Sequence, residues 1–393
     1  MIITRLQLSN WRNFKHLDLE LRDRVFIVGP NAIGKSNLLD ALRFLRDVAQ
    51  PVGGGLRYAV DGQRRGIKRI RSLHQQGKVV VGIAVTVKDN AAIWTYDLRF
   101  TEGKGRDRPV VVHAETVTKD GETLVARPDV DDGQDPERLS QTALQNESAN
   151  HQFRPLARFF ASILYQHLVP QLVKENRYFA GVDIPGDPFG IRFIERVAKV
   201  GKTKADRLLK LVERELRAAV PNLDKLRLEN DPKTGLPHLE VRYQHWRAIA
   251  ARQDETDFSD GTLRLIALLW ILLDHGGPLL LEEPEINLNG AIIREIPRII
   301  WRLQQRRSRQ VIISSHSADL LNDKTIDPAE IVILRPGKDG TRAETAPSIM
   351  EILALLDSGA TPAEAVLPLI SPRVEGMARQ LTLFDDQARE VGE

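Results

Sequence analysis

The chain has 393 residues and no cysteine, which excludes a disulfide framework and a thiolate metal site. Its composition, 42% hydrophobic and 28% charged, is that of an ordinary globular protein, and a net charge of +3 does not by itself establish nucleic-acid binding. The N-terminus lacks a signal-peptide layout, and the most apolar run, 263–273, is shorter than the roughly 20 residues of a membrane span. We therefore expect a cytoplasmic protein with no membrane partner.

The first part of the chain is predicted to form strands followed by a helix. Apolar residues alternate between positions 6 and 21, and Val25–Val28 is a short buried run, so strands are expected up to residue 28. A helix is predicted through Asn37–Leu42. Residues 51–77 are rich in glycine and arginine and are interpreted as a mobile loop.

The rest of the chain is predicted to contain further strands, a helical region and a hairpin. Three further strands are predicted, at Lys78–Val87, Ala91–Phe100 and Pro109–Thr118. The acidic stretch Asp129–Glu137 is interpreted as a surface loop, and residues 153–220 have helical periodicity. A hairpin is expected at Leu226–Tyr243, and residues 278–345 alternate strand with helix, as parallel sheets do.

The turn after the first buried run has the spacing of a phosphate-binding loop. Residues 29–36 read G-P-N-A-I-G-K-S, which matches G-x-x-x-x-G-K-[ST] between a strand and a helix. Its glycines would let backbone N–H groups close around phosphate oxygens, Lys35 would neutralise the outer phosphates, and the Ser36 hydroxyl would bind Mg²⁺. The alternative is a glycine turn that only caps a helix. The residues expected to bind nucleotide here are Gly29, Asn31, Gly34, Lys35, Ser36 and Asn37.

A second apolar strand, within Pro278–Glu285, ends in carboxylates and has the Walker B pattern. Glu282 would hold the magnesium ion together with Ser36. Glu283 would lie beyond the γ-phosphate and activate the attacking water. The alternative is a plain solvent-facing loop at the end of the strand.

A third apolar strand, Val311–Ser315, is followed directly by His316. This histidine could donate a hydrogen bond to the γ-phosphate and so sense which nucleotide is bound. A histidine at the end of a strand can also be purely structural. Glu283 and His316 are the two candidate catalytic residues.

Residues 258–264, F-S-D-G-T-L-R, resemble the signature motif of ABC ATPases in the S-D-G-T-x-R form of RecF-like and OLD-family proteins. The opening L-S-N-W-R-N-F at 8–14, the G-K-S-N loop and the E-E-P-E strand end also look like that group. This resemblance covers nearly the whole chain in the correct order. It implies an α/β fold, namely an ABC-ATPase head: a P-loop NTPase mixed sheet with an antiparallel β subdomain and a helical lobe.

The resemblance also implies ATP and Mg²⁺ as cofactors and an ATP-dependent head-to-tail homodimer. Each ATP would lie between the phosphate loop of one subunit and Ser259, Asp260 and Gly261 of the other. Such a helix start can form an anion site when phosphate is delivered from outside. The alternative is a simple N-cap, with Ser259 or Asp260 ahead of an apolar helix.

The sequence departs from the family pattern at three places. Ala32-Ile33 stands where relatives often have a glycine, and Leu288-Asn289-Gly290 stands where the family commonly has L-H-P, which leaves the D-loop around Asn287–Asn289 in doubt. The family's Q-loop glutamine has no clear equivalent. Three glutamines are candidates for it: Gln75, Gln76 and Gln141.

From these motifs we expect four regions. Residues 1–150 would form an ATPase lobe with Walker A and the β subdomain, and 151–257 a helical lobe. Residues 258–370 would carry the signature, Walker B, D-loop and histidine half, and 371–393 a flexible tail. After His316 there is no acidic cluster suited to a TOPRIM nuclease, so DNA cutting would need a nuclease or another effector in trans.

Two basic groups and one peptide suggest further partners. Arg57, Arg64-Arg65, Lys68-Arg69 and Arg71 form one basic group, and Arg302, Arg306-Arg307 and Arg309 another; either could contact DNA phosphates or be a solvated face. Residues Gln380–Phe384, Q-L-T-L-F, look like the peptide by which bacterial DNA-processing proteins bind the sliding clamp, or else pack on the protein's own core.

The sequence thus predicts an ATPase that acts in DNA repair or anti-phage defence. A second interpretation is an ATP-gated scaffold with little turnover that restrains a toxin or nuclease. A third, the energising subunit of a transporter, is disfavoured by the S-D-G-T signature and the long insertion between 40 and 258.

Overall fold

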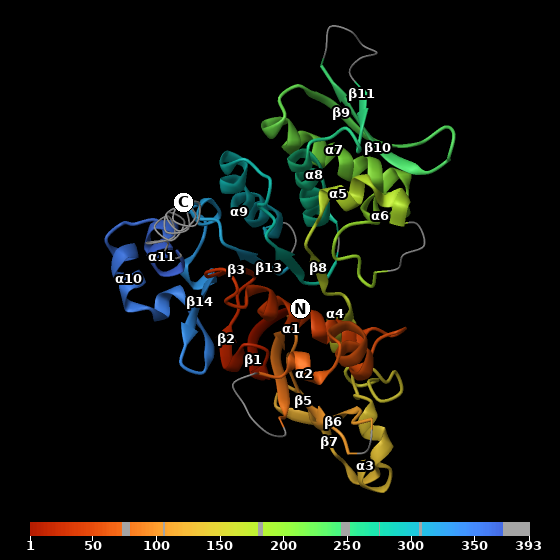
Figure 1. Ribbon diagram of the computed structural model, residues 1–393, viewed down its shortest axis with the longest axis vertical. Helices are drawn as coiled ribbons and strands as arrows, with labels where there is room; N and C mark the ends of the chain where they lie inside the picture. The colour runs from red at the N-terminus through yellow and green to blue at the C-terminus, as the bar shows by residue number, and fades with distance from the viewer. Residues whose placement is uncertain are drawn as a thin grey trace, which may run out of the picture.

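The computed structural model describes residues 1–72, 79–104, 107–179, 184–244, 252–274, 276–305 and 309–371. Most strands of this part of the chain belong to one large sheet: β1 (Ile2–Trp11), β2 (Phe14–Glu20), β3 (Arg24–Val28), β4 (Val81–Lys88), β5 (Ile93–Glu102), β6 (Val110–Lys119), β7 (Glu122–Arg127), β8 (Leu164–Gln166), β12 (Leu279–Glu282), β13 (Val311–Ser315), β14 (Ile331–Gly337) and β15 (Gly340–Thr345). A smaller sheet consists of β9 (Leu223–Asn230), β10 (Pro237–Tyr243) and β11 (Arg252–Asp254). Figure 1 shows the small sheet at one end of the molecule and β5–β7 at the other.

The large sheet is mixed, with the order β7-β6-β5-β4-β1-β2-β15-β14-β3-β13-β12-β8 among the described residues. Strands β14, β3, β13, β12 and β8 run parallel, so their carboxyl ends lie along one edge. The strands from β7 to β15 pair antiparallel. This arrangement confirms the predicted α/β class with a mixed sheet and an antiparallel β subdomain.

The burial of the central strands explains why their sequences are continuous apolar runs. All five residues of β3 and all five of β13 are buried, as expected for parallel strands covered on both faces. Successive side chains of these strands point to opposite faces of the sheet. Ile312 packs in a cluster with the β subdomain and the phosphate-loop helix, whereas Ile313 packs in a second cluster with the helical part of the chain.

Helices cover both faces of the sheet and the end that carries the small sheet (Figure 1). The longer ones are α1 (Lys35–Ala49), α4 (Arg154–Ala161), α7 (Lys202–Ala219), α8 (Asp260–Leu273), α9 (Gly290–Gln304), α10 (Met350–Asp357) and α11 (Pro362–Ile370), and the shorter ones are α2 (Ile67–Ile70), α3 (Val130–Gln134), α5 (Pro170–Lys174) and α6 (Phe193–Lys199). None of the helices in the described ranges has the length and apolar character that crossing a bilayer requires.

Several expected elements are confirmed, and three expectations are wrong. The three strands after residue 78 form β4, β5 and β6, and the hairpin at 226–243 forms β9 and β10. The predicted mobile loop is ordered through residue 72, with a π-helical turn and α2, because Leu56, Val60 and Ile70 are buried. The acidic stretch after 129 contains α3, held by a capping box. The helical run from 153 is interrupted by β8, which pairs with β12.

Candidate functional site

The phosphate loop lies between β3 and α1, as its sequence predicts. Gly34 precedes α1 with a φ of 111°, and a Cβ atom there would lie 2.1 Å from Asn13 Nδ2, so glycine is required for both reasons. Ala32, in the same loop, also has a positive φ, 61°. The first turn of α1 has no side-chain cap, so its N–H groups are free to bind an anion.

Asn13, in the turn between β1 and β2, holds the phosphate loop through side-chain hydrogen bonds. Its Nδ2 donates to the carbonyl of Ile33 and to Thr341 Oγ1, and its Oδ1 accepts from Asn37 Nδ2 at 2.8 Å. Thr341 Oγ1 donates to the same carbonyl at 2.7 Å. In the sequence, Asn13 is only one letter of the opening motif at 8–14 that resembles the family, and nothing in the local pattern marks it as a residue of the site.

The Lys35 side chain is bound by backbone carbonyls of its own phosphate loop. Its buried ammonium donates to the carbonyls of Gly29 at 2.8 Å and Pro30 at 3.1 Å. Burial lowers the pKa of Lys35, and the charges of nearby carboxylates, Glu283 first, act against that shift. Phosphate oxygens at this position would replace two neutral carbonyls by charged acceptors, which form stronger hydrogen bonds with an ammonium.

Glu282 lies at the carboxyl end of β12, next to Ser36, the other residue predicted to bind the metal. One oxygen of its carboxylate accepts a hydrogen bond from Ser36 Oγ, and the other accepts one from the Tyr165 hydroxyl. A serine hydroxyl and a carboxylate are hard oxygen donors, which Mg²⁺ prefers when it also binds substrate phosphates. Ser36 and Glu282 therefore fit Mg²⁺, and they lie together although 246 positions separate them.

Tyr165 is a second residue of this site, after Asn13, that no sequence motif predicts. It lies on β8 opposite Leu280 of β12, and the Arg43 guanidinium carbon lies 5.2 Å from the centre of its ring. Burial, and then the charge of Glu282, raises the pKa of Tyr165 well above its ordinary value, so the hydroxyl stays protonated as a donor. Periodicity could not reveal it, because β8 is only three residues long and lies within a helical pattern.

None of the three candidate Q-loop glutamines occupies this position in the described part of the chain. Gln75 and Gln76 lie outside the described residues. Gln141 is exposed in the β subdomain, where its carbonyl accepts from Arg127 at 2.7 Å. The side chain that reaches Glu282 from the neighbouring strand is Tyr165.

Glu283 and His316 are adjacent at the ends of β12 and β13. His316 Nδ1 lies 3.1 Å from Glu283 Oε1, and the two side chains are 47% and 25% exposed. The Glu283 backbone has a φ of 47°, and its N–H donates to the Ser314 carbonyl at 2.9 Å. The two predicted catalytic side chains therefore form one pair open to solvent beside the phosphate loop.

Two further charged residues near this pair, Glu285 and Arg264, are buried. Glu285 accepts a hydrogen bond from Ser315 Oγ, and burial raises its pKa. Arg264, of the predicted signature, is buried with Nη1 3.4 Å from the Glu283 carbonyl, and burial lowers its pKa. The guanidinium thus joins α8 to the Walker B turn.

The signature residues lie at the start of α8. Ser259 caps this helix, accepting from the Thr262 N–H at 3.2 Å, while Asp260 pairs with Lys174 at 2.8 Å and accepts from Gln171. A Cβ on Gly261 would lie 2.6 Å from the Asn287 carbonyl, so the helix start packs directly on the predicted D-loop. Within the described residues no hydrogen bond or ion pair connects 259–261 to the phosphate loop.

The two basic groups are only partly exposed. Arg64 was wrongly expected at a DNA surface: it is buried and pairs with Asp40 at 2.8 Å and Asp47 at 3.0 Å. Arg309 donates to the carbonyls of Ile271 at 2.6 Å and Gly277 at 2.8 Å, and burial lowers its pKa to about 10. Residues exposed to solvent are Arg57, Arg65, Lys68, Arg69 and Arg302. Arg306, Arg307 and the Gln380–Phe384 peptide lie outside the described residues.

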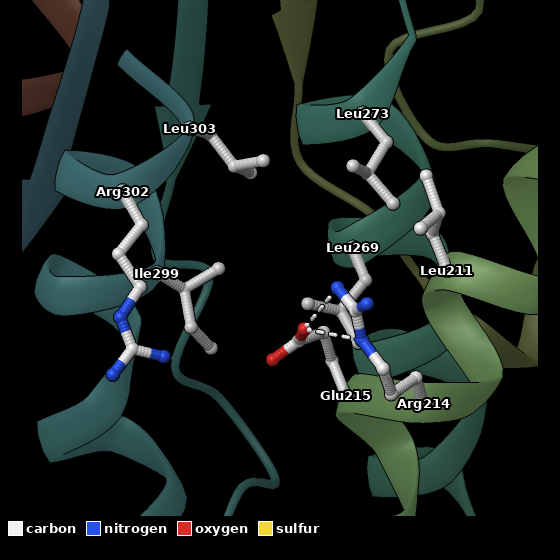
Figure 2. Close-up of a pocket in the computed structure, with 8 residues that line it drawn as sticks. All are labelled: Leu211, Arg214, Glu215, Leu269, Leu273, Ile299, Arg302 and Leu303. Carbon is white, nitrogen blue, oxygen red and sulfur yellow. Dashed lines mark hydrogen bonds and ion pairs between the residues drawn. The ribbon is translucent and has the colours of Figure 1, made fainter. Parts of the chain in front are cut away.

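An apolar cavity of about 300 Å³ lies between α7, α8 and α9, away from the nucleotide motifs. Figure 2 shows Leu211, Leu269 and Leu273 on one side and Ile299 and Leu303 on the other. Its charged members, on α7 and α9, are Arg214, Glu215 and Arg302. No residue predicted for the nucleotide site lines this cavity, whereas Arg302 belongs to the second basic group.

Comparison with known proteins identifies the family. Residues 24–322, about three quarters of the chain, match the family model described as "AAA domain, putative AbiEii toxin, Type IV TA system". A stretch of 46 residues is 50% identical to the DNA replication and repair protein RecF of Bacillus mycoides, and 67 residues are 39% identical to that of Roseiflexus castenholzii. These matches span only 12% and 17% of either chain.

A solved SMC head, crystallised bound to the C-winged helix domain of ScpA, has a similar fold. The TM-score is 0.52 at 15% identity, over 88% of this chain and 97% of that one. At this identity the likeness concerns the fold alone. The phosphate loop, signature helix and Walker B strand end follow one another in the order found above, and the chain belongs to the AAA-domain family that its residues 24–322 match.

Proposed function

We propose that this protein binds and hydrolyses Mg-ATP, dimerises head to tail when ATP is bound, and acts in DNA metabolism, in repair or anti-phage defence, with a nuclease or other effector in trans. The observation that carries the proposal is the junction of Ser36 with Glu282 beside the Glu283–His316 pair. One oxygen-donor set for the metal and one exposed carboxylate–imidazole pair lie at neighbouring ends of parallel strands.

In this proposal each residue has a separate task. Lys35 would exchange its two loop carbonyls for the outer phosphates, and Ser36 with Glu282 would hold Mg²⁺, which neutralises phosphate charge. Glu283 would accept a hydrogen bond from the attacking water, and His316 would orient this carboxylate and contact the γ-phosphate. Phosphoryl transfer needs positioning and charge neutralisation more than covalent help, and this set supplies both.

The open start of α8 supports a composite site. Ser259 is exposed, and α8 has 14 residues, so its aligned peptide dipoles favour an anion at this end. No hydrogen bond or ion pair within the described part of the chain joins that end to its own phosphate loop. A second copy, placed head to tail, would bring Ser259 and Gly261 to the nucleotide held by the first.

The DNA part of the proposal rests on an exposed basic surface beside α1, the helix that follows the phosphate loop. Arg57, Arg65, Lys68 and Arg69 are exposed on the segment that packs against α1. Sequence-independent phosphate contacts of this kind depend strongly on salt. Two curated relatives bear the name DNA replication and repair protein, which agrees with such a partner.

The test is Glu283→Gln, which keeps the size of the side chain and removes its charge. We expect turnover to fall by about 100-fold or more, while ATP with Mg²⁺ converts the variant to a dimer in size-exclusion chromatography with light scattering. Lys35→Ala is the matched control and should stay monomeric under the same conditions. A Glu283→Gln protein that stays monomeric with Mg-ATP would contradict the composite site.

The ATP-bound dimer of Glu283→Gln also tests whether DNA is a partner. We expect it to bind duplex DNA more tightly than the nucleotide-free protein, with an affinity that falls as salt rises. Turnover of the wild-type protein should increase when DNA is added. Equal DNA binding in both states together with unstimulated turnover would favour the ATP-gated scaffold.

A further inference from the structure

Tyr165 occupies a position that no predicted motif accounts for. Strand β8 is the outermost strand of the parallel part of the sheet, and it pairs with β12 through Leu164, Tyr165 and Gln166. Its middle residue carries the hydroxyl that donates to Glu282, on the carboxylate oxygen that Ser36 does not use. Each oxygen of the Walker B carboxylate therefore has one side-chain donor of its own.

We propose that Tyr165 is a positioning residue of the magnesium site, whose hydroxyl holds the Glu282 carboxylate in the orientation in which its other oxygen faces Ser36. This inference rests on the proposed function as a Mg-ATPase. It assigns to Tyr165 on β8 the side-chain contact to Glu282 from the neighbouring strand, which neither Gln141 nor any other residue predicted for the Q-loop makes within the described part of the chain.

The physical reason is the rotational freedom of a carboxylate. An ionised carboxylate accepts hydrogen bonds and donates none, so its plane is set by the donors around it. With Ser36 alone, Glu282 could turn about its last bond and present either oxygen, or neither, to a metal ion. A second donor on the opposite oxygen removes this freedom, and partners of this kind commonly change metal affinity by 10- to 100-fold.

The tyrosine ring is anchored independently of its hydroxyl. Backbone pairing of β8 with β12 fixes its Cα, and Arg43 of α1 lies over the ring at 5.2 Å. Arg43 is itself held by Gln63, whose Oε1 accepts from Nη2 at 3.2 Å. Replacing tyrosine by phenylalanine should therefore leave the ring in place and remove only the hydrogen bond to Glu282.

The experiment compares ATP binding with and without the metal. A fluorescent ATP analogue is titrated into full-length wild type and Tyr165→Phe, first in EDTA and then across a Mg²⁺ series. We expect the Mg²⁺ concentration for half-maximal enhancement to rise about tenfold in Tyr165→Phe, with affinity in EDTA unchanged. Tyr96→Phe is the matched control, because Tyr96 is also buried and donates to a glutamate, Glu115 at 3.0 Å, outside the nucleotide site.

The possible contrary results distinguish a failure of the Tyr165 inference from a failure of the proposed function. A Mg²⁺ dependence in Tyr165→Phe equal to that of wild type and Tyr96→Phe overturns the role of Tyr165 and leaves the proposed function standing. An equal loss of affinity with and without Mg²⁺ makes the tyrosine structural and also overturns it. Absence of Mg²⁺-dependent ATP binding in the wild type overturns the proposed function and this inference together.

Discussion

Asn13 shows how much of the site depends on a single amide. Its side chain joins the turn after β1 to the phosphate loop, to the start of α1 and to Thr341 of β15. The nitrogen donates and the oxygen accepts, so both ends of the amide are used. No other residue type of similar size offers a donor and an acceptor in this geometry, so the loop conformation depends on asparagine here.

Asn13→Ala should therefore lower both stability and nucleotide affinity. We expect the free energy of unfolding to fall by about 1–3 kcal/mol, because three hydrogen bonds are lost and their partners are left partly unsatisfied. We also expect nucleotide affinity to fall about tenfold, as the unsupported loop must be ordered on binding. Urea unfolding and nucleotide titration are the measurements.

Lys35→Ala is the comparison for Asn13→Ala. It should abolish nucleotide binding without a similar loss of stability, since the buried ammonium leaves with its own desolvation cost. If Asn13→Ala kept wild-type nucleotide affinity, the amide would not support the binding conformation of the loop.

Among the elements, the contact between α8 and the predicted D-loop connects the predicted signature to the Walker B strand β12. Gly261 lies directly against the Asn287 carbonyl, and Arg264, one turn on, donates to the Glu283 carbonyl. Asn287 has a φ of 62°, and Asn289 caps α9 two residues later. The start of α8 and the segment from Glu283 to Asn289 therefore move as one unit or lose these contacts.

Gly261→Ala tests this unit. The added Cβ would lie 2.6 Å from a backbone oxygen, so the start of α8 must shift, at a cost of about 1–3 kcal/mol in stability. We expect monomeric nucleotide binding within about twofold of wild type, because the phosphate loop is untouched, and loss of the ATP-dependent dimer. Gly133→Ala on α3 is the control, since a Cβ there meets nothing within 4 Å. Retention of the ATP-dependent dimer by Gly261→Ala would contradict the prediction.

At the scale of the whole molecule, the parallel strands divide the core into two clusters and also hold them together. One cluster contains Trp11, Leu280 and Ile312, and the other contains Trp270 and Ile313. Each cluster contains side chains from β3, β12, β13 and β14, so neither can open without breaking the backbone pairing that the other requires. We expect the described part of the chain to unfold as one unit.

Ile312→Ala and Ile313→Ala test this expectation on neighbouring residues of one strand. Both side chains are buried, and each substitution should lower the free energy of unfolding by about 2–5 kcal/mol. Fluorescence from a tryptophan of each cluster, with the other tryptophans replaced by phenylalanine, should follow the same urea transition in both variants. Two separate transitions, of which each variant shifts only one, would show that the clusters fold independently.

The amino-acid sequence was sufficient to predict the fold class, the order of the motifs and most residues of the candidate nucleotide site. Gly34, Lys35 and Ser36 could be located because a phosphate loop imposes fixed spacing within a few residues of chain. The carboxylates at the end of β12 and the histidine after β13 could be predicted because each comes directly after an apolar run. Local pattern was sufficient wherever the chemistry lies within one strand and the turn after it.

Which distant side chains join the candidate site depends on how the strands pair in the tertiary structure. Tyr165 reaches Glu282 because β8, a strand of three residues, adds to the edge of the sheet beside β12. Asn13 reaches the phosphate loop through a turn between two antiparallel strands. Arg64 looked like a surface cation, but it is buried because Asp40 and Asp47 on α1 offset its charge. These contacts join residues far apart in the chain, and no local periodicity encodes which strands become neighbours.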